Sequence, residues 1–371
     1  MKVEDHLSLE TPFTDRNRAL GGKIVDFAGY LMPLQFAGQL KEHEAVRTGV
    51  GLFDLSHMGE FHFSGPGALE FTDHLLTNQL SAKEPGGIVY SPMCRPDGGI
   101  VDDVLAYRRE DGVLLVVNAA NIEKDLEWVR SHAPEGMIVH DRSADTALLA
   151  IQGPKAGAVV KPFTGDWITD LGYYHFREFL WDGVPVLISR TGYTGEDGFE
   201  LFFDRRHADT MWERIQEAGK PHDMAPIGLA ARDTLRLEVG YCLYGNDIDD
   251  TTTPLEAGLQ WTVKLDKPDF IGKDALVTQK AAGLRRKLMG LTIDQAGMIP
   301  RAGMNVLTDG TVTGRVTSGT MSPSLKKSIA MAYVPIGSAK PGSEVQVDIR
   351  GRTARAVVQR LPFYTEGTRK S

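Results

Sequence analysis

Two adjacent aspartates, Asp102 and Asp103, interrupt an otherwise apolar strand pattern at residues 100–107 (IVDDVLAY). Because successive side chains of a strand point to opposite faces, the two carboxylates must lie on different sides of a sheet. At least one of them is directed toward packed protein or a cleft, where an unpaired charge is costly or shifts its pKa. The pair could serve a structural ion pair or a turn cap, or it could direct a carboxylate at a cationic reacting centre.

The composition predicts a globular chain with more than one domain. Its 371 residues exceed the size of a single ordinary core, so we expect two or three domains. Hydrophobic residues make up 42% and charged residues 24% of the chain, as in soluble proteins. The 40 glycines and 19 prolines indicate many turns, and therefore substantial β structure.

Charge and cysteine content exclude several classes of function. The net charge of −8 argues against a nucleic-acid partner, which would need a basic face. Cys94 and Cys242, the only cysteines, form neither a disulfide framework nor a metal cluster, and so indicate a reducing compartment. The first residues resemble neither a secretory signal nor a transit peptide, and no segment reaches the ~18 consecutive apolar residues of a membrane span. We therefore expect a cytoplasmic protein with no membrane partner.

Apolar periodicity predicts both helices and strands in the first part of the chain. Helices are expected over 37–50, 66–79, 207–219 and 226–239, and another is expected between residues 118 and 129. Strands are expected over 113–118 and 146–151 and within 184–203.

After a basic connection near residues 280–287 the pattern changes. From Leu288 onward, short alternating strands are separated by glycine-containing turns, which predicts a small all-β unit of roughly 80 residues. We therefore divide the chain into residues 1–280, composed of two intertwined α+β subdomains, and residues 285–371, a C-terminal β-barrel domain.

Common catalytic and metal-binding motifs are missing from the sequence. It contains no G-x-x-x-x-G-K-[ST], G-x-G-x-x-G, H-E-x-x-H or G-x-S-x-G motif. The ten histidines are scattered, and His57 and His62, the closest pair, have no carboxylate set with ligand spacing around them. We therefore predict no metal site.

Glu200 is the only charge within FELFF (199–203), the apolar end of the stretch RTGYTGEDGFELFF (190–203). A glutamate in such a strand either pairs with a nearby arginine or binds a ligand that carries N–H donors. Its planar, bidentate carboxylate suits the amino and ring N–H edge of a heterocycle.

Arg232 and Arg236 share one face of the predicted helix over 226–239, and Asp233 can pair with Arg236. Because like charges four residues apart repel, we expect at least one arginine to have a partner outside the helix, either an acidic side chain or a substrate carboxylate. The following loop, residues 240–249, is dense in polar and aromatic groups, as site-lining loops often are.

Six stretches together resemble the T-protein family of the glycine cleavage system, which consists of folate-dependent aminomethyltransferases. The resemblance runs from about Thr11 to about Tyr364, in the family's order and spacing. Its stretches are DFAGYLMPLQF (26–36), DLSHMGEF (54–61), GGIVDDVLAY (98–107), RTGYTGEDGFELF (190–202), ARDTLRLEVGYCLYGNDID (231–249) and TSGTMSPSLKKSIAMAYV (317–334).

The resemblance implies an α+β fold, a three-domain cloverleaf with a central folate channel and a C-terminal barrel-like domain. It implies tetrahydrofolate as co-substrate and the lipoyl-bearing H-protein as partner. The implied reaction moves the aminomethyl carbon of the dihydrolipoyl arm to folate, which releases ammonia and yields 5,10-methylenetetrahydrofolate in glycine catabolism.

The resemblance also assigns site residues. The family's catalytic aspartate matches Asp102, which we expect to face the channel, while Asp103 lies on the opposite face in a structural ion pair or cap. The other matches are the pterin-binding Glu200, the site arginine Arg232, the nearby Tyr193, the channel-lining Asn118, Tyr90 and Met58, and a substrate-contacting tyrosine, Tyr364.

The residue types suit this chemistry, because a fixed carboxylate can stabilise the cationic carbon left by departing ammonia, orient the folate nitrogens or move a proton. Two alternatives remain open at this stage. One is a folate-dependent demethylase of a methylated amine or sulfonium compound, although the CLYGNDID run is retained here. The other is a non-enzymatic folate-binding relative, whose K-G-C-Y-x-G-Q signature this chain lacks.

Overall fold

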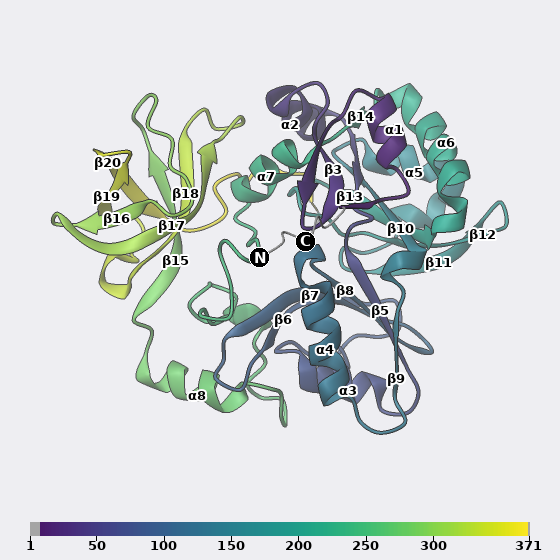
Figure 1. Ribbon diagram of the computed structural model, residues 1–371, viewed down its shortest axis with the longest axis horizontal. Coiled ribbons are helices and arrows are strands. Elements are labelled where there is room, and N and C mark those ends of the chain that lie inside the picture. Colours follow the sequence, from purple (N-terminus) through teal and green to yellow (C-terminus); the bar gives the residue numbers. More distant parts are fainter. Residues whose placement is uncertain (1–7, 370–371) are drawn as a thin grey trace, which may run out of the picture.

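The structure is a computed structural model of the chain, and it describes residues 8–369. Three lobes surround a common centre, as Figure 1 shows: a β-barrel, an α+β unit around a five-stranded sheet and an α+β unit around a six-stranded sheet. The predicted α+β class and the C-terminal barrel are both confirmed.

The five-stranded sheet carries the two aspartates on its second strand. Its order is β6 (Ile88–Cys94), β7 (Ile100–Arg108), β8 (Gly112–Val117), β5 (Gly59–Ser64) and β9 (Ile138–Asp141). Helices α3 (Ala68–Leu75) and α4 (Ile122–His132) cover one face and bury Phe61, Phe71 and Val129 against it. Burial of these apolar side chains is the main stabilising contribution to this lobe.

The six-stranded sheet carries Glu200. Its order is β11 (Phe176–Trp181), β12 (Val184–Ser189), β13 (Gly198–Asp204), β10 (Thr146–Gln152), β4 (Gly51–Asp54) and β14 (Ala225–Pro226). Helices α5 (Ala156–Thr164) and α6 (Ala208–Gly219) pack on one face. Phe53, Leu148 and Phe202 on the opposite face pack against Tyr107 and Leu114 of the five-stranded sheet.

A small three-stranded sheet completes the N-terminal part, in the order β1 (Leu9–Glu10), β3 (Tyr30–Gln35) and β2 (Lys23–Phe27). Three further helices are α1 (Thr14–Ala19), α2 (Gln39–Thr48) and α7 (Leu229–Glu238), and α2 and α7 pack with side chains of the six-stranded sheet. Short 3-10 turns join the elements: η1 (Ala119–Asn121), η2 (Ser143–Asp145), η3 (Asp166–Thr169), η4 (Arg205–His207), η5 (Lys220–His222), η6 (Gln260–Thr262) and η7 (Ile336–Ser338).

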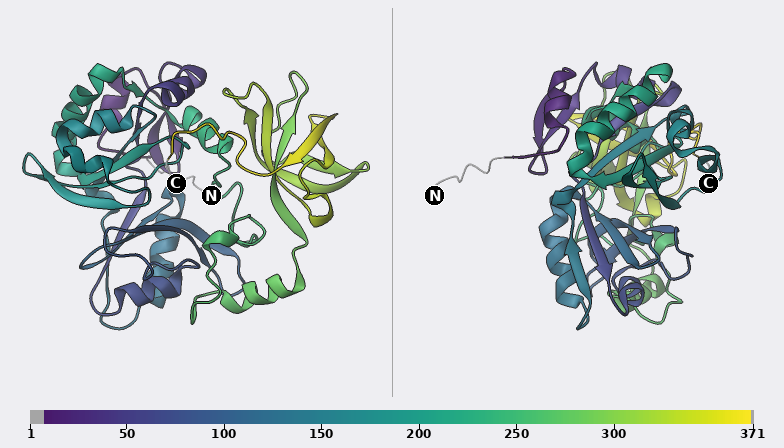
Figure 2. Two further views of the ribbon diagram at one scale, coloured as in Figure 1. Left: turned by 180° about the vertical axis from the view of Figure 1, so that it is seen from behind. Right: turned by 90° about the vertical axis from the view of Figure 1, so that its right-hand side faces the viewer.

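The C-terminal barrel follows helix α8 (Lys273–Ala282) and closes in the order β15 (Arg286–Ile293), β18 (Ser328–Pro335), β17 (Thr311–Met321), β16 (Asn305–Thr308), β19 (Glu344–Ile349) and β20 (Arg352–Gln359). Closure leaves the sheet without an exposed edge. After β20 the chain leaves the barrel and crosses to the six-stranded unit, as the view from behind in Figure 2 shows. There the Arg369 amide donates to the Gly195 carbonyl.

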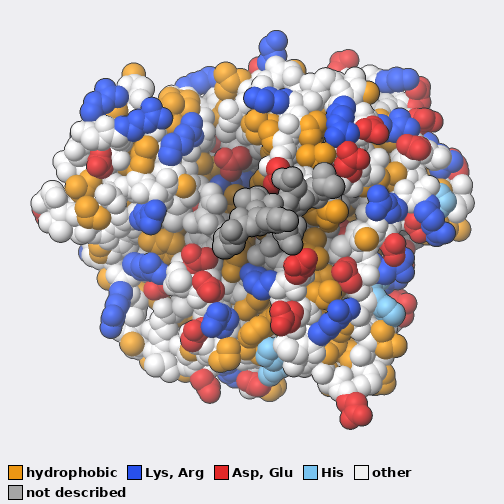
Figure 3. Space-filling model, viewed as in Figure 1, with side chains coloured by type: hydrophobic (Ala, Val, Ile, Leu, Met, Phe, Trp, Pro, Cys, Tyr) orange, Lys and Arg blue, Asp and Glu red, His pale blue; other side chains and the backbone are white. Residues whose placement is uncertain are grey.

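The five predicted helices are all confirmed, four of them with shorter bounds, while α4 continues past the expected end at residue 129 to His132. The helix expected over 66–79 ends at Leu75, because Leu76 is already extended. The helix expected over 226–239 begins at Leu229, after the extended Gly228. None of the helices within residues 8–369 has the length and apolar character to cross a membrane. Acidic and basic side chains are interspersed over the face in Figure 3.

Candidate active site

A cavity of about 1520 Å³ lies where the three lobes meet. Its walls come from both large sheets, α7, the loop after α7, residues 257–264 and the barrel. Such a site between structural units is the usual place for a small-molecule substrate. The structure brings six of the eight predicted residues to the cavity wall: Met58, Tyr90, Asn118, Tyr193, Glu200 and Arg232.

The expected orientation of the aspartate pair is wrong. Asp103 lines the cavity, whereas Asp102 is fully buried and is not part of the wall. Asp102 lies on the same side of β7 as Val104 and Ala106, which belong to the core beneath α3 and α4. Apolar residues occupy both faces of β7, so alternation alone could not tell which aspartate faces the cavity.

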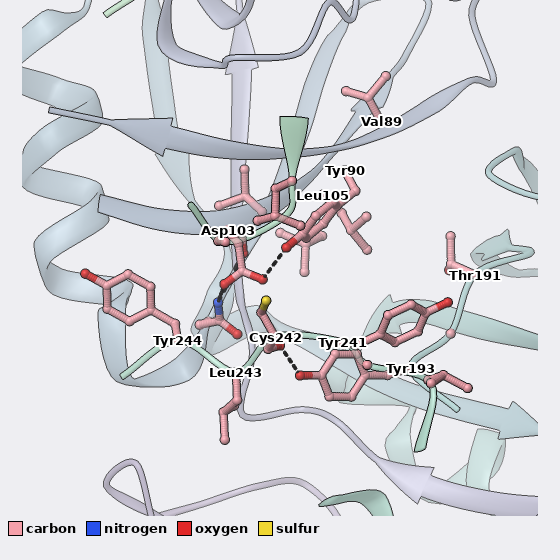
Figure 4. A pocket seen from close by; sticks show the side chains of 18 of the residues that line it. Val89, Tyr90, Asp103, Leu105, Thr191, Tyr193, Tyr241, Cys242, Leu243 and Tyr244 are labelled. Carbon is pink, nitrogen blue, oxygen red and sulfur yellow. Dashed lines mark hydrogen bonds between the residues drawn. The ribbon is translucent and has the colours of Figure 1, made fainter. Parts of the chain in front are cut away.

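Asp103 is held by two hydrogen bonds, both drawn in Figure 4. The Tyr90 hydroxyl donates to Oδ2 at 2.9 Å, and Nδ2 of Asn118 donates to Oδ1 at 3.0 Å. Burial, reinforced by the neighbouring Asp102, raises the pKa of Asp103 well above its usual range, while the two donors act in the opposite direction. A carboxyl group whose pKa is raised in this way can exchange a proton with a bound substrate.

Asp102 forms a separate set of contacts behind the cavity wall. It accepts hydrogen bonds from the backbone amide of Asn118 at 3.0 Å and from its Nδ2 at 2.8 Å. Nδ2 of Asn121 donates to the same carboxylate at 2.6 Å. Asn118, directly after β8, therefore links both aspartates through the same amide nitrogen, Nδ2.

Glu200 contributes the second carboxylate of the cavity wall, from β13. Among the described residues only the Thr191 hydroxyl donates to its side chain. The sequence also allowed a salt bridge between Glu200 and a nearby arginine. Glu200 has no such bridge within residues 8–369, because Arg190 pairs with Asp197 at 2.7 Å. Burial raises the pKa of Glu200, and Thr191 and the positive charge of Arg232 oppose that rise.

Arg232 lies over the ring of Tyr193, 4.7 Å from its centroid, and burial lowers its pKa. The predicted pair on the same helix is confirmed, because Arg236 Nε donates to Asp233 at 2.9 Å. Arg236 also donates to Asp247 at 2.5 Å, so it has the expected partner outside the helix. Arg232 is therefore the arginine that remains in the cavity wall.

Tyr364 does not line the cavity, so its expected substrate contact is not supported. Its ring lies against Arg47, whose guanidinium carbon is 4.2 Å from the ring centroid. The same segment contributes Arg369 instead. Its guanidinium donates to the Tyr241 hydroxyl and lies 5.6 Å from the Tyr173 ring centroid.

Comparison with known families agrees with this geometry. The model of the GCVT N-terminal domain matches residues 13–267, and that of the glycine cleavage T-protein C-terminal barrel domain matches residues 286–365. The chain belongs to the glycine cleavage T-protein family. Aminomethyltransferases from Moorella thermoacetica and Halothermothrix orenii are similar to it along almost their whole lengths.

The Moorella thermoacetica protein is 49% identical over 357 residues, which cover 96% of this chain and 97% of the relative. The Halothermothrix orenii protein is 46% identical over 355 residues, which cover 95% of this chain and 99% of the relative. A crystal structure of glycine cleavage system aminomethyltransferase T from Bartonella henselae superimposes with a TM-score of 0.90 at 35% identity, covering 97% of this chain and 99% of that one. The T-protein family assignment makes the chain an aminomethyltransferase.

Several wall residues of this T-protein family member were not predicted individually. Trp261 stacks on Tyr90 with ring centroids 5.9 Å apart, and Tyr173 and Arg369 join the wall from distant segments. Only the aromatic density of loop 240–249, which includes Tyr241, gave a signal in the sequence. Burial raises the pKa of the Cys242 thiol well above its usual range, so this cysteine is no activated nucleophile.

Residues 8–369 contain no group of three or more histidine, cysteine, aspartate or glutamate side chains arranged to hold a metal ion. The polar groups that line the cavity include the Asp103 carboxyl, the Glu200 carboxyl and the Arg232 guanidinium. Together they can bind a polar heterocycle and exchange a proton at a second point in the same space.

Proposed function

We propose that this aminomethyltransferase takes the aminomethyl carbon from the S-aminomethyl-dihydrolipoyl arm of H-protein and transfers it to tetrahydrofolate. Ammonia is released and 5,10-methylenetetrahydrofolate forms, as a step of glycine catabolism in the cytoplasm. The observation that carries this proposal is a single cavity that contains Asp103, Glu200 and Arg232 in a chain of the T-protein family.

Glu200 and Arg232 are the proposed pterin-binding residues. The Glu200 carboxylate has acceptor sites left over after its bond from Thr191, and these suit adjacent N–H groups of a heterocycle. Arg232 offers donors beside it and is kept in place by the ring of Tyr193. The Tyr193 hydroxyl is itself fixed, because it donates to the Cys242 carbonyl. The donors and acceptors of these residues therefore suit the polar edge of a folate ring.

Asp103 takes the catalytic role that the sequence resemblance gave to Asp102. A catalytic carboxyl must reach the reacting atoms, and only Asp103 of the pair borders the cavity. When tetrahydrofolate is bound, its nitrogens supply the nucleophile that captures the carbon. Asp103, with its raised pKa, holds or accepts a proton beside that carbon and stabilises the positive charge that develops there.

A long carrier arm suits the depth of this site. The Asp103 side chain is held among Tyr90, Asn118 and the loop after α7, inside the junction of the three lobes. A protein-bound donor can reach such a position only through a flexible extension, and a lipoyl arm on H-protein has this form. The C-terminal segment, with Leu361 and Pro362 in the wall, borders the same space.

The test is to mix the purified chain with aminomethylated H-protein and tetrahydrofolate and to measure ammonia and 5,10-methylenetetrahydrofolate. We expect equal amounts of both products, and neither without H-protein. Parallel reactions offer a methylated amine or a sulfonium compound in place of H-protein. Turnover with one of those donors and none with H-protein would replace the proposal with a folate-dependent demethylase.

A further inference from the structure

A second carboxyl group, Asp125, lies buried behind the cavity wall next to Asp102. It belongs to the first turn of α4, and its side chain is completely buried. Neither of its oxygens accepts a hydrogen bond from a donor among residues 8–369. Lys124, the nearest cation, is 4.0 Å from Oδ1 and donates instead to the Val101 carbonyl.

Asp125 lies one helical turn after Asn121, whose side chain donates to Asp102 at 2.6 Å, so the Asp125 side chain is on the helix face that meets Asp102. Two ionised carboxylates cannot share such a buried space, because their repulsion adds to the cost of removing both charges from water. One proton between them removes the repulsion and one of the two buried charges, and the protonated carboxyl can donate to the ionised one. Asp102 already accepts from three N–H groups of Asn118 and Asn121, whereas Asp125 accepts from no donor among residues 8–369. The proton therefore belongs on Asp125.

We propose that Asp125 is a neutral acid that donates to Asp102, and that this buried pair positions Asp103 through the Asn118 side chain. The inference rests on the proposed role of Asp103 in the transfer reaction. Asp125 and Asp102 touch no cavity space, so both are positioning residues and not catalytic ones.

The connection runs through a single amide group. Nδ2 of Asn118 donates to Asp102 Oδ1 at 2.8 Å and to Asp103 Oδ1 at 3.0 Å. An amide nitrogen carries two hydrogens: one is directed to Asp102, and the other is shared between Asp103 Oδ1 and the Asp103 backbone carbonyl, which lies 3.1 Å from the same nitrogen. A hydroxyl from Asp125 fixes Asp102, Asp102 fixes the Asn118 amide, and that amide fixes one oxygen of Asp103. The Tyr90 hydroxyl independently fixes the other oxygen.

The charges around the pair agree with this assignment. Burial, followed by the charge of Asp102, raises the pKa of Asp125 to about 11, and Lys124 opposes this only weakly. The remaining groups that face the pair are Tyr244, whose pKa burial and these carboxylates raise, and Asp103 itself. The cation nearest to the pair, Lys124, also lies over the Tyr244 ring, 4.1 Å from its centroid.

The first experiment locates the proton without reference to turnover. The infrared spectrum of the full chain at pH 7 should contain the carbonyl band of a protonated carboxylic acid that disappears in Asp125→Asn. Loss of an ionised carboxylate band instead would overturn the proposal. This readout is independent of the donor substrate, so it remains informative even if the proposed transfer reaction fails.

The second experiment tests the positioning role. Asp125→Asn keeps an N–H donor toward Asp102 and should retain kcat within about threefold, whereas Asp125→Ala should lose about tenfold or more in kcat with the KM for folate nearly unchanged. Asp125→Leu, which also lacks a donor, replaces the alanine variant if that variant does not fold. A kcat equal to that of the wild type in the donor-free variant would contradict the proposal, as would equal losses in the asparagine and donor-free variants.

Glu60 on β5 offers a matched control. It is also buried, both of its carboxyl oxygens lack a donor among residues 8–369, and burial raises its pKa well above the usual range. It neither lines the cavity nor contacts Asn118. Glu60→Gln should therefore remove a protonated-acid band while leaving kcat unchanged. A loss of kcat as large as that of Asp125→Ala would show that any buried acid has this effect, and would overturn the specific role of Asp125.

Discussion

The hydroxyl of Tyr90 donates a 2.9 Å hydrogen bond to Oδ2 of Asp103, across neighbouring strands of the five-stranded sheet. A donor stabilises the ionised carboxylate, so this bond keeps the pKa of Asp103 lower than burial and Asp102 alone would set it. Removal of the phenol oxygen of Tyr90 should therefore be sufficient to change the pH dependence of the reaction.

In Tyr90→Phe the pKa of Asp103 should rise further. We expect the pH–rate profile of kcat to move to higher pH by up to about one unit, if the lost bond contributes about 1 kcal/mol. Phenylalanine can retain the stacking on Trp261, so the fold and the wall shape should persist. The measurement is kcat between pH 5 and 9. A shift to lower pH would contradict the assigned direction.

Asp103→Asn should retain folate binding and lose turnover. The amide has nearly the same shape but cannot exchange a proton or stabilise positive charge, so we expect kcat to fall by about 10²–10⁴. The folate dissociation constant, measured by calorimetry, should change by only a few-fold, because Glu200 and Arg232 are untouched. Unchanged turnover would exclude Asp103 as the catalytic carboxyl.

The sequence was sufficient for the architecture and for most of the cavity wall. Helical and alternating apolar patterns located five of the helices, several strands and the barrel because each pattern follows local geometry, but they did not predict α1, α5 or α8. The resemblance placed Met58, Tyr90, Asn118, Tyr193, Glu200 and Arg232 in one site, and all six line the cavity.

Long-range packing decided what the sequence left open. The choice between Asp102 and Asp103 depends on which face of β7 is covered by α3 and α4, and local alternation does not contain that information. Arg369 reaches the cavity only because the C-terminal segment crosses from the barrel to Gly195. The division into residues 1–280 and 285–371 stays a prediction.

Glu200→Ala should weaken folate binding itself. Hydrogen bonds to a charged group contribute about 1.5–3 kcal/mol, so the dissociation constant should rise by about 10- to 100-fold. Glu178→Gln is the matched control, because Glu178 lies on β11 of the same sheet but pairs with Arg109 at the surface. Equal folate affinity in the wild type and Glu200→Ala would remove Glu200 from the pterin site.

Glu238 should make stability depend on pH in acid. This carboxylate at the end of α7 is fully buried and accepts hydrogen bonds from Arg47 at 2.9 Å, from Ser322 at 2.5 Å and from Ser324 at 2.8 Å. Burial alone would raise the pKa of Glu238, but hydrogen bonding and charge from His43, the Ser322 hydroxyl and Arg47 lower it to about 2.

A carboxylate with a lowered pKa stabilises the folded state above its unfolded pKa and loses that contribution as the pH falls through its folded pKa. The window for Glu238 is therefore about pH 4.5 down to about pH 2, and the contribution at neutral pH is about 3 kcal/mol.

Glu238→Gln should lower the urea midpoint strongly at pH 7, and the difference from the wild type should shrink through this window. Glu344→Gln, which alters an exposed pair with Arg355, should change the midpoint little at any pH. A Glu238→Gln difference that stays constant from pH 7 to pH 2 would show that the charge of Glu238 does not stabilise the junction between α7 and the barrel.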